Sequence, residues 1–281
     1  MQMVPVSGGA QLATESFGVA QRGTILLVMG ATASMVWWPD ALCHQLAEGG
    51  YRVIRYDHRD TGQSTTAPPG ALRYDLADMT DDIFAVLDAY GADAAHLVGM
   101  SLGGLLAQHA AARMPQRVLS LTLIAAEPLG LTYAGEGMSP ALLAHFGTLG
   151  TLDWSDAAAV EAALLETARL CAGSAVPFDI AAARTRIRRE MQRSDSLASA
   201  FNHGMLSEGL DPELTARALR QPTLVVHGSE DPVIAVAAGA AIAAAVPGAD
   251  LLVLPGRGHE ITDTDIPTIS AAMLELCDRA G

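Results

Sequence analysis

The feature that most constrains the fold is an alternation of short apolar runs with longer segments of helical spacing. The runs are rich in β-branched residues and occupy residues 24–29, 52–56, 95–98, 118–125, 223–226 and 251–254. Between them, apolar side chains recur every three or four positions, as at Ile83, Val86 and Leu87, which is the spacing of one helix face. Nearly continuous apolar strands separated by helices are typical of a mostly parallel sheet with helices on both faces, so the sequence predicts an α/β fold. The expected helices cover residues 38–48, 79–90, 102–112 and 233–246.

This rhythm is interrupted after Glu127 and resumes after Pro222. The intervening chain has no strand-like run and shows three helical patterns, at residues 140–148, 156–171 and 179–192. We therefore expect a helical cap at residues 129–218, inserted between two strands of a core formed by residues 1–128 and 219–281. Such a cap would lie as a lid over the ends of the strands.

Composition narrows the class of partner. The chain has 281 residues, with 17 Lys and Arg against 31 Asp and Glu, a net charge of −14, and half of the residues are apolar. This apolar fraction can bury a large core, while the negative charge repels phosphate backbones and anionic lipid surfaces. We expect neither a nucleic acid nor a membrane as partner, and the longest run of membrane-like character, residues 233–246, is too short to cross a bilayer.

The three cysteines indicate a reducing environment. Cys43, Cys171 and Cys277 are far apart and lack a C-x-x-C spacing, so they predict neither a disulfide framework nor a zinc site. The N-terminal residues lack a basic region followed by an apolar stretch, which is the pattern of a secretory signal. We expect a cytoplasmic protein without metal or other cofactor, and the sequence carries no signal for its oligomeric state.

The sharpest motif is Gly99-Met100-Ser101-Leu102-Gly103, which directly follows one predicted strand and directly precedes a predicted helix. The string alone is weak, because in a chain of this composition it arises by chance with a probability of about 0.1. Its position makes it specific: a strained strand-to-helix turn exposes the hydroxyl above the sheet edge, and the flanking glycines avoid collisions. Ser101 is therefore the candidate nucleophile.

A serine hydroxyl needs a base to accept its proton. Of the eight histidines, His259 alone lies in a loop immediately after the last predicted strand, within Pro255-Gly256-Arg257-Gly258-His259. The carboxyl ends of parallel strands share one edge, where open α/β sheets hold their ligands. His259 is thus expected on the same edge as Ser101, and we interpret it as the base.

The acid that orients this base should come from another such loop. Asp231 follows the strand at residues 223–226 and precedes His259, which gives the chain order Ser, Asp, His. Its neighbour Glu230 competes for the role. Glu127, at the end of the strand at residues 118–125, is a second alternative, although we favour Asp231.

The oxyanion formed by nucleophilic attack on a carbonyl needs two backbone N–H donors. One expected donor is the amide of Leu102, which follows the nucleophile. The other is the amide of Ala31, in the small-residue loop after the strand at residues 24–29.

Substrate contacts are predicted from larger apolar residues of the cap and from residues beside the nucleophile. The candidates are Gly30, Trp38, Met100, Phe146 and His203. Each aromatic residue belongs to the core more often than to a pocket. For His203 we favour a surface helix position over a place in the pocket. The negative charge and the apolar cap favour a neutral or cationic hydrophobic substrate.

These motifs resemble the α/β-hydrolase superfamily of esterases, haloperoxidases and epoxide hydrolases, over residues 21–127 and 220–276. The resemblance rests on Gly99-Met100-Ser101-Leu102-Gly103, Tyr56-Asp57-His58-Arg59-Asp60-Thr61-Gly62-Gln63-Ser64, His227-Gly228-Ser229-Glu230-Asp231-Pro232 and Gly256-Arg257-Gly258-His259. Residues 27–30 and 54–62 are most similar to those of the anthracycline methylesterases of the aclacinomycin type, in which Met-Gly also replaces the more frequent His-Gly before the oxyanion residue.

The resemblance implies hydrolysis of a carboxylic ester, a methyl ester or another hydrophobic small-molecule ester, through an acyl-enzyme on Ser101. Dehalogenases and epoxide hydrolases of this fold use an aspartate nucleophile, so serine at position 101 disfavours both chemistries. Other uses of the same fold stay open: a cofactor-free haloperoxidase, a thioesterase or C–C hydrolase, and a non-catalytic ligand receptor that keeps the hydrolase shell.

Overall fold

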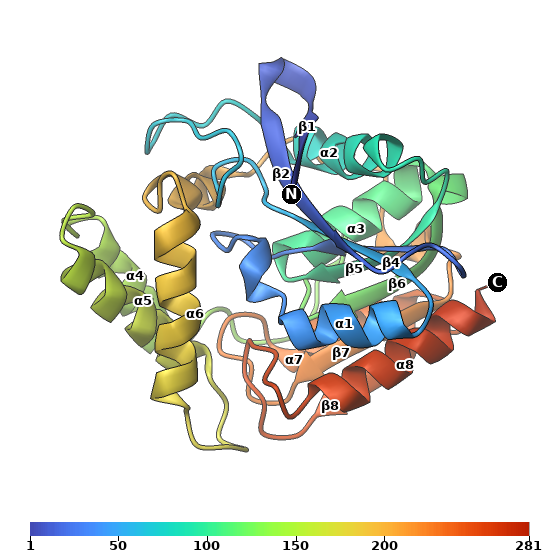
Figure 1. Cartoon of the computed structure of the whole chain (residues 1–281). Coiled ribbons are helices and arrows are strands. Elements are labelled where there is room, and N and C mark those ends of the chain that lie inside the picture. The colour runs from blue at the N-terminus through green and yellow to red at the C-terminus, as the bar shows by residue number, and fades with distance from the viewer. Residues whose placement is uncertain (281) are drawn as a thin grey trace.

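A central eight-stranded sheet organises the computed structural model, which describes residues 1–280 (Figure 1). The strands are β1 (Gln2–Pro5), β2 (Gln11–Phe17), β3 (Thr24–Val28), β4 (Arg52–Tyr56), β5 (Ala95–Met100), β6 (Val118–Ile124), β7 (Thr223–Gly228) and β8 (Asp250–Leu254). Their spatial order is β1-β2-β4-β3-β5-β6-β7-β8. Neighbouring strands from β4 to β8 in this order are parallel, whereas β2 is antiparallel to both β1 and β4. The predicted α/β fold with a mostly parallel sheet is confirmed.

The antiparallel hairpin of β1 and β2 was not predicted from the sequence. Its turn contains Gly8 and Gly9, whose φ angles of 68° and 74° lie in the left-handed region that glycine adopts without strain. Only Val4 is buried in β1, so this strand lacks the continuous apolar character by which the central strands were recognised.

Helices cover both faces of the sheet, as predicted. Those of the core are α1 (Asp40–Glu48), α2 (Leu76–Ala89), α3 (Leu102–Arg113), α7 (Val236–Ala245) and α8 (Ile266–Arg279). Figure 1 shows α1 and α8 on one face and α2 and α3 on the other. Two apolar layers result: Met79, Leu106 and Ile242 belong to the layer under α2, α3 and α7, while Leu42 and Met273 belong to the layer under α1 and α8.

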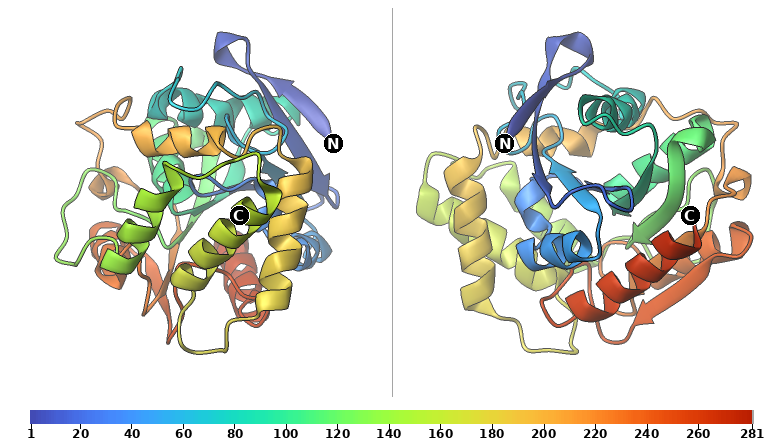
Figure 2. Two further views of the ribbon diagram at one scale, coloured as in Figure 1. Left: turned by 90° about the vertical axis from the view of Figure 1, so that its left-hand side faces the viewer. Right: turned by 45° about the vertical axis from the view of Figure 1, so that its right-hand side comes forward.

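The segment between β6 and β7 is helical, as its pattern indicates. It contains α4 (Pro140–Leu149), α5 (Ala157–Cys171), α6 (Ile180–Arg193) and the 3₁₀ helix η4 (Ser199–Met205). Asp156 and Asp179 cap the first turns of α5 and α6 by accepting hydrogen bonds from backbone N–H groups. Figure 2 shows these helices beside the core rather than within its layers. No helix in residues 1–280 combines the length and apolarity needed to cross a membrane.

Candidate active site

Ser101 lies at the turn between β5 and α3. Its φ and ψ of 52° and −120° are far from the helical values that begin at Leu102, and its side chain makes no capping hydrogen bond to the helix. Left-handed φ values are costly for residues with a side chain, and they persist at functional sites where the surrounding structure holds them. The turn therefore leaves the hydroxyl available for chemistry.

The glycines on both sides of Ser101 are required by close backbone approach. A Cβ atom on Gly103 would lie 2.0 Å from the carbonyl oxygen of Val28, and one on Gly99 would lie 2.3 Å from the carbonyl oxygen of Gly103. Any larger residue at either position would force β5, β3 and the first turn of α3 apart. Local sequence and tertiary packing thus agree on the same sharp turn.

His259 and Asp231 form a hydrogen-bonded pair. The Nδ1 atom of His259 donates to Oδ2 of Asp231 at 2.7 Å, and the Asp231 side chain is fully buried. The other carboxylate oxygen, Oδ1, accepts from the backbone N–H groups of Val233 and Ile234 at 2.8 and 2.9 Å. Three donors therefore fix the carboxylate, and the carboxylate in turn fixes the imidazole with Nε2 facing away from it.

The two competing carboxylates have other partners. The Glu127 carboxylate accepts from the hydroxyl of Tyr133 at 2.8 Å. The Glu230 carboxylate accepts from the backbone N–H and the hydroxyl of Ser174, at 2.9 and 2.8 Å. The geometry favours Asp231 as the acid that orients His259.

Ser101 and His259 share one edge of the sheet, because they follow the carboxyl ends of the parallel strands β5 and β8. No hydrogen bond joins the Ser101 hydroxyl to His259 among the described residues. Catalytic hydrogen bonds in free enzymes are often long and shorten only in the complex with substrate. The structure thus brings His259 and Asp231 into contact and places Ser101 on the same edge of the sheet.

The expected oxyanion loop borders Ser101. A Cβ atom on Gly30 would lie 3.2 Å from Cβ of Ser101, so the backbone after β3 comes directly against the nucleophile. Leu102 is the first residue of α3, where the N–H group has no acceptor within the helix. Both features fit the predicted donors, the amides of Ala31 and Leu102.

Two further groups close to the acid stay neutral. Burial lowers the pKa of His227, whose Nε2 donates to the carbonyl of Ile234 at 2.9 Å and lies 3.5 Å from Oδ2 of Asp231. Burial, and then the charge of Asp231, raises the pKa of Cys171 to about 12. The thiol is therefore protonated at neutral pH and does not compete with Ser101 as a nucleophile.

The prediction that Trp38 contacts the substrate is wrong. Its side chain is fully buried in the apolar layer under α1 and α8 and is not open to substrate in this structure. Gly30 lies against Ser101, and Met100, half-buried, immediately precedes it. Phe146 lies on α4 and is half-buried, so its contact with substrate stays a prediction.

His203 is also not at the surface helix position considered for it from the sequence. Its side chain is 5% exposed, and both ring nitrogens have protein partners. Nδ1 is 3.0 Å from the backbone nitrogen of Thr32, and Nε2 is 2.8 Å from the carbonyl oxygen of Arg59. The polar atoms of His203 are thus already used within the protein and are not available to a substrate.

The cap is joined to the core by a buried ion pair that the sequence analysis missed. Arg193, at the end of α6, donates from Nη1 and Nη2 to Oδ1 and Oδ2 of Asp57, both at 2.8 Å. Asp57 is fully buried and also accepts from the N–H groups of Met35 and Gln63, at 2.8 and 2.9 Å. The only signal for this ion pair in the sequence was Asp57, directly after β4. It belongs to the motif at residues 56–64, which the sequence analysis used only for the family resemblance.

A second set of cap contacts reaches the same region. Glu190 on α6, whose pKa is raised by burial, accepts a hydrogen bond from the hydroxyl of Ser34 and another from that of Ser194. Asn202 on η4 donates to the carboxylate of Asp60 at 2.9 Å. The cap therefore binds the loops after β3 and β4 through polar side chains at several points.

The cap also contacts the loop that carries the histidine. The backbone N–H of His259 donates to the carbonyl of Cys171, the last residue of α5, at 2.8 Å. A Cβ on Gly258 would lie 2.0 Å from that same oxygen. The end of α5 thus supports the histidine loop directly.

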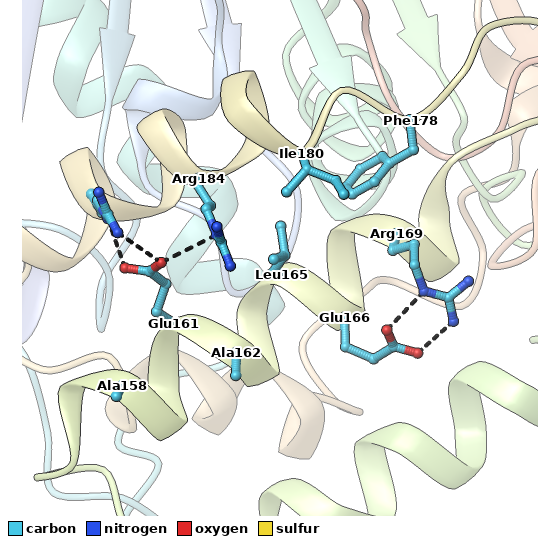
Figure 3. Close-up of a pocket in the computed structure, with 10 residues that line it drawn as sticks. Ala158, Glu161, Ala162, Leu165, Glu166, Arg169, Phe178, Ile180 and Arg184 are labelled. Carbon is cyan, nitrogen blue, oxygen red and sulfur yellow. Dashed lines mark hydrogen bonds and ion pairs between the residues drawn. The ribbon is translucent and has the colours of Figure 1, made fainter.

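A hollow of about 460 Å³ lies within the cap, between α5 and α6 (Figure 3). Leu165, Phe178 and Ile180 form its apolar part, and Glu161 bridges Arg184 and Arg188 across it. None of the candidate catalytic residues lines this hollow. Among residues 1–280, no group of three His, Cys, Asp or Glu side chains is arranged to hold a metal ion.

Comparison with known proteins agrees with the fold and the motifs. The family model of the alpha/beta hydrolase fold matches residues 23–265. Rhodomycin D methylesterase DauP from Streptomyces sp. (strain C5) is 30% identical over 267 residues, which are 88% of each chain. A hydrolase from Pseudomonas aeruginosa PA01 superimposes with a TM-score of 0.71 at 27% identity, over 98% of this chain and 97% of that one.

The structural likeness extends to more distant members. The esterase RhEst1 from Rhodococcus sp. ECU1013 is 22% identical, with a TM-score of 0.78 over 100% of this chain and 99% of that one. At this identity the likeness concerns the fold. Together with the match of the family model over most of the chain, it identifies this protein as a member of the α/β hydrolase fold family.

Proposed function

We propose that this protein is a serine hydrolase that cleaves a carboxylic ester through an acyl-enzyme on Ser101. The observation that carries the proposal is the hydrogen bond of 2.7 Å between His259 and Asp231, on the sheet edge where the strained turn presents Ser101. An imidazole held in this way has its Nε2 free to accept a proton. Its membership of a family with esterase relatives supports the same conclusion.

In the acylation step, the Ser101 oxygen attacks the ester carbonyl carbon while Nε2 of His259 takes the hydroxyl proton. The carbonyl electrons move to oxygen, and the N–H groups of Ala31 and Leu102 stabilise the resulting oxyanion. Asp231 stabilises the imidazolium. When the carbonyl re-forms, the C–O bond to the alcohol breaks and His259 gives its proton to the departing alkoxide.

The second step restores the enzyme. Water attacks the acyl carbon while His259 again accepts a proton, and the same N–H groups stabilise the second oxyanion. Collapse releases the carboxylic acid, and His259 returns the proton to the Ser101 oxygen. One ester and one water thus yield one acid and one alcohol, with no cofactor required.

The proposed substrate is a hydrophobic small molecule that carries a methyl ester or a similarly small alcohol group. Two observations support this class: the net charge of −14, which disfavours anionic ligands, and the similarity to a rhodomycin D methylesterase. In hydrolysis of a methyl ester, the large acid part stays on Ser101 and methanol leaves first.

The test is a panel of methyl esters, lactones, acyl thioesters and p-nitrophenyl esters, measured with the wild-type protein and Ser101→Ala. We expect turnover of esters by the wild type and a loss of about 10⁴- to 10⁶-fold in kcat for the variant. A fluorophosphonate probe should label the wild type at Ser101 and leave the variant unlabelled.

Two results would contradict the proposal. Labelling of Ser101 without turnover of any ester would indicate a ligand receptor that keeps the hydrolase shell. Turnover that survives in Ser101→Ala would show that the chemistry does not proceed through this hydroxyl. Preference for thioesters over oxygen esters would keep the mechanism and change the substrate class.

A further inference from the structure

The loop that presents the expected oxyanion donor Ala31 is held by a histidine of the cap. We propose that His203 is a positioning residue, which holds this loop in its working conformation by accepting the Thr32 N–H. The inference rests on the proposed ester hydrolysis, because it assigns a catalytic purpose to the loop. His203 contacts neither the nucleophile nor the substrate in this account, and acts through the backbone of residues 30–32.

The hydrogen bonds define the tautomer of His203. The carbonyl oxygen of Arg59, 2.8 Å from Nε2, can only accept, so Nε2 carries the proton. Nδ1 then has a free lone pair, and the backbone N–H of Thr32 donates to it at 3.0 Å. Each bond requires the protonation pattern that the other requires, and the neutral imidazole satisfies both.

Thr32 needs such a partner because its backbone is strained. Its φ of 64° lies in the left-handed region, which a β-branched residue rarely adopts. Thr32 is exposed, so its own burial does not explain the conformation. The hydrogen bond from its N–H group to His203 is a specific restraint on it, and this restraint acts one residue away from the donor Ala31.

The other end of the loop has an equivalent restraint from the core. Nε2 of His58 donates to the carbonyl of Met29 at 2.8 Å, and the rings of His58 and His203 meet edge to face with centroids 6.0 Å apart. Burial lowers the pKa of both histidines, that of His58 to about 3. Two neutral histidines thus bracket Gly30 and Ala31, one from the core and one from the cap.

The position of His203 is itself defined by its neighbour on η4. Asn202 donates to the Asp60 carboxylate at 2.9 Å and accepts from the Gly70 N–H at 2.7 Å. Through this short helix, the loop after β4 fixes where Nδ1 of His203 lies. The cap therefore contributes to the position of the loop that carries the expected oxyanion donor.

A matched pair of substitutions separates this role from a general contribution to stability. His203→Asn places an amide oxygen near the position of Nδ1, where it can accept from Thr32, and abandons the bond to Arg59. His203→Gln places an amide nitrogen near the position of Nε2, where it can donate to Arg59, and abandons the bond to Thr32. Each variant keeps one of the two hydrogen bonds.

We expect His203→Asn to keep kcat within about threefold of the wild type, and His203→Gln to lose about 10- to 100-fold with little change in KM. The loss is smaller than the 10²- to 10³-fold typical of a deleted oxyanion donor, because the Ala31 N–H is misaligned rather than absent. The affinity for a trifluoromethyl ketone, whose adduct with Ser101 carries an oxyanion, should fall in parallel with kcat. Equal losses in both variants that follow their thermal stability would overturn the proposal.

Hydrogen exchange gives a readout that needs no substrate. The Thr32 amide, although it belongs to an exposed residue, should exchange slowly in the wild type and in His203→Asn, and faster in His203→Gln. Fast exchange of this amide in the wild type would by itself refute the proposal. Absence of ester turnover by the wild type would refute the proposed function instead, and the exchange data would still decide whether His203 holds the loop.

Discussion

Replacing Asp231 by Asn tests the assignment of the orienting acid most directly. The substitution keeps the size of the side chain and exchanges one carboxylate oxygen for an NH₂ group. Oδ1 of Asp231 accepts from two backbone N–H groups, those of Val233 and Ile234, whereas Oδ2 accepts from His259. The orientation of the Asn amide therefore depends on whether its oxygen accepts from the two backbone N–H groups or from His259.

The backbone donors decide that orientation. If the NH₂ group faced them, two hydrogen bonds worth about 0.5–1.5 kcal/mol each would be lost and donors would face donors. The amide oxygen of Asn therefore stays with Val233 and Ile234, and its NH₂ group points at Nδ1 of His259. Nδ1 must then accept, which places the imidazole proton on Nε2, the atom that has to receive the proton of Ser101.

A base in the wrong tautomer is expected to lower kcat by about 10⁴-fold, or about 5 kcal/mol of transition-state stabilisation. Steady-state hydrolysis of a reactive ester measures this loss, and ¹⁵N NMR of the imidazole identifies the tautomer. Glu127→Gln is the matched control, because it makes the same chemical change in the alternative acid and should leave kcat within about threefold.

Two outcomes would refute the reasoning. One is a kcat of Asp231→Asn within about tenfold of the wild type. The other is a large loss in Glu127→Gln with a proton still on Nδ1 of His259. Thermal unfolding of both variants checks that any loss is not caused by unfolding.

Two further predictions concern stability. Arg193→Met should reduce the free energy of unfolding by about 3 kcal/mol, because it leaves the fully buried Asp57 carboxylate without its counter-ion. Urea unfolding of a double-mutant cycle with Asp57→Asn measures the coupling energy of the pair. A coupling energy below about 0.5 kcal/mol would contradict this prediction. Burial lowers the pKa of His96 to about 4 in the folded state, below the value of about 6.5 expected in the unfolded chain. The contribution of the neutral His96 to stability is therefore fully present above about pH 6.5. It is lost as the pH falls below that value, because the unfolded state then binds the proton more readily than the folded state. Between pH 7 and 5 the wild type should lose about 1–2 kcal/mol more than His96→Asn, and equal losses would show that His96 does not contribute.

The cap is hydrogen-bonded to the core at several points besides being inserted into it. Its helices bind the loops after β3 and β4 through Glu190, Arg193 and His203, and the end of α5 accepts from the His259 N–H. Because the cap is hydrogen-bonded both to the loops after β3 and β4 and to the loop of His259, it acts as part of the scaffold of the candidate site. Substitutions in the cap are therefore expected to change catalysis as well as substrate choice.

Several features were predictable because they depend on local pattern. The central strands are buried on both faces, so their apolar runs marked them within one or two residues, and the cap helices α4 to α6 follow their apolar spacing closely. The β1–β2 hairpin and α8 were missed. The apolar run of β8 suggested burial, yet β8 is the edge of the sheet and exposes Leu251 and Val253, because nothing local records which strand has a neighbour.

The sequence by itself determined the α/β class, the inserted helical segment and the turn at Ser101, because each depends on residues close together in the chain. Only the tertiary structure decided that Asp231 rather than Glu127 meets His259, that Trp38 belongs to the core, and that the Thr32 N–H donates to His203. The hydrogen bond between Thr32 and His203 joins residues more than a hundred positions apart, and the partner of His259 had to be selected from chemically similar carboxylates. Hydrogen-bond partners over such separations are selected by packing, which no local pattern encodes.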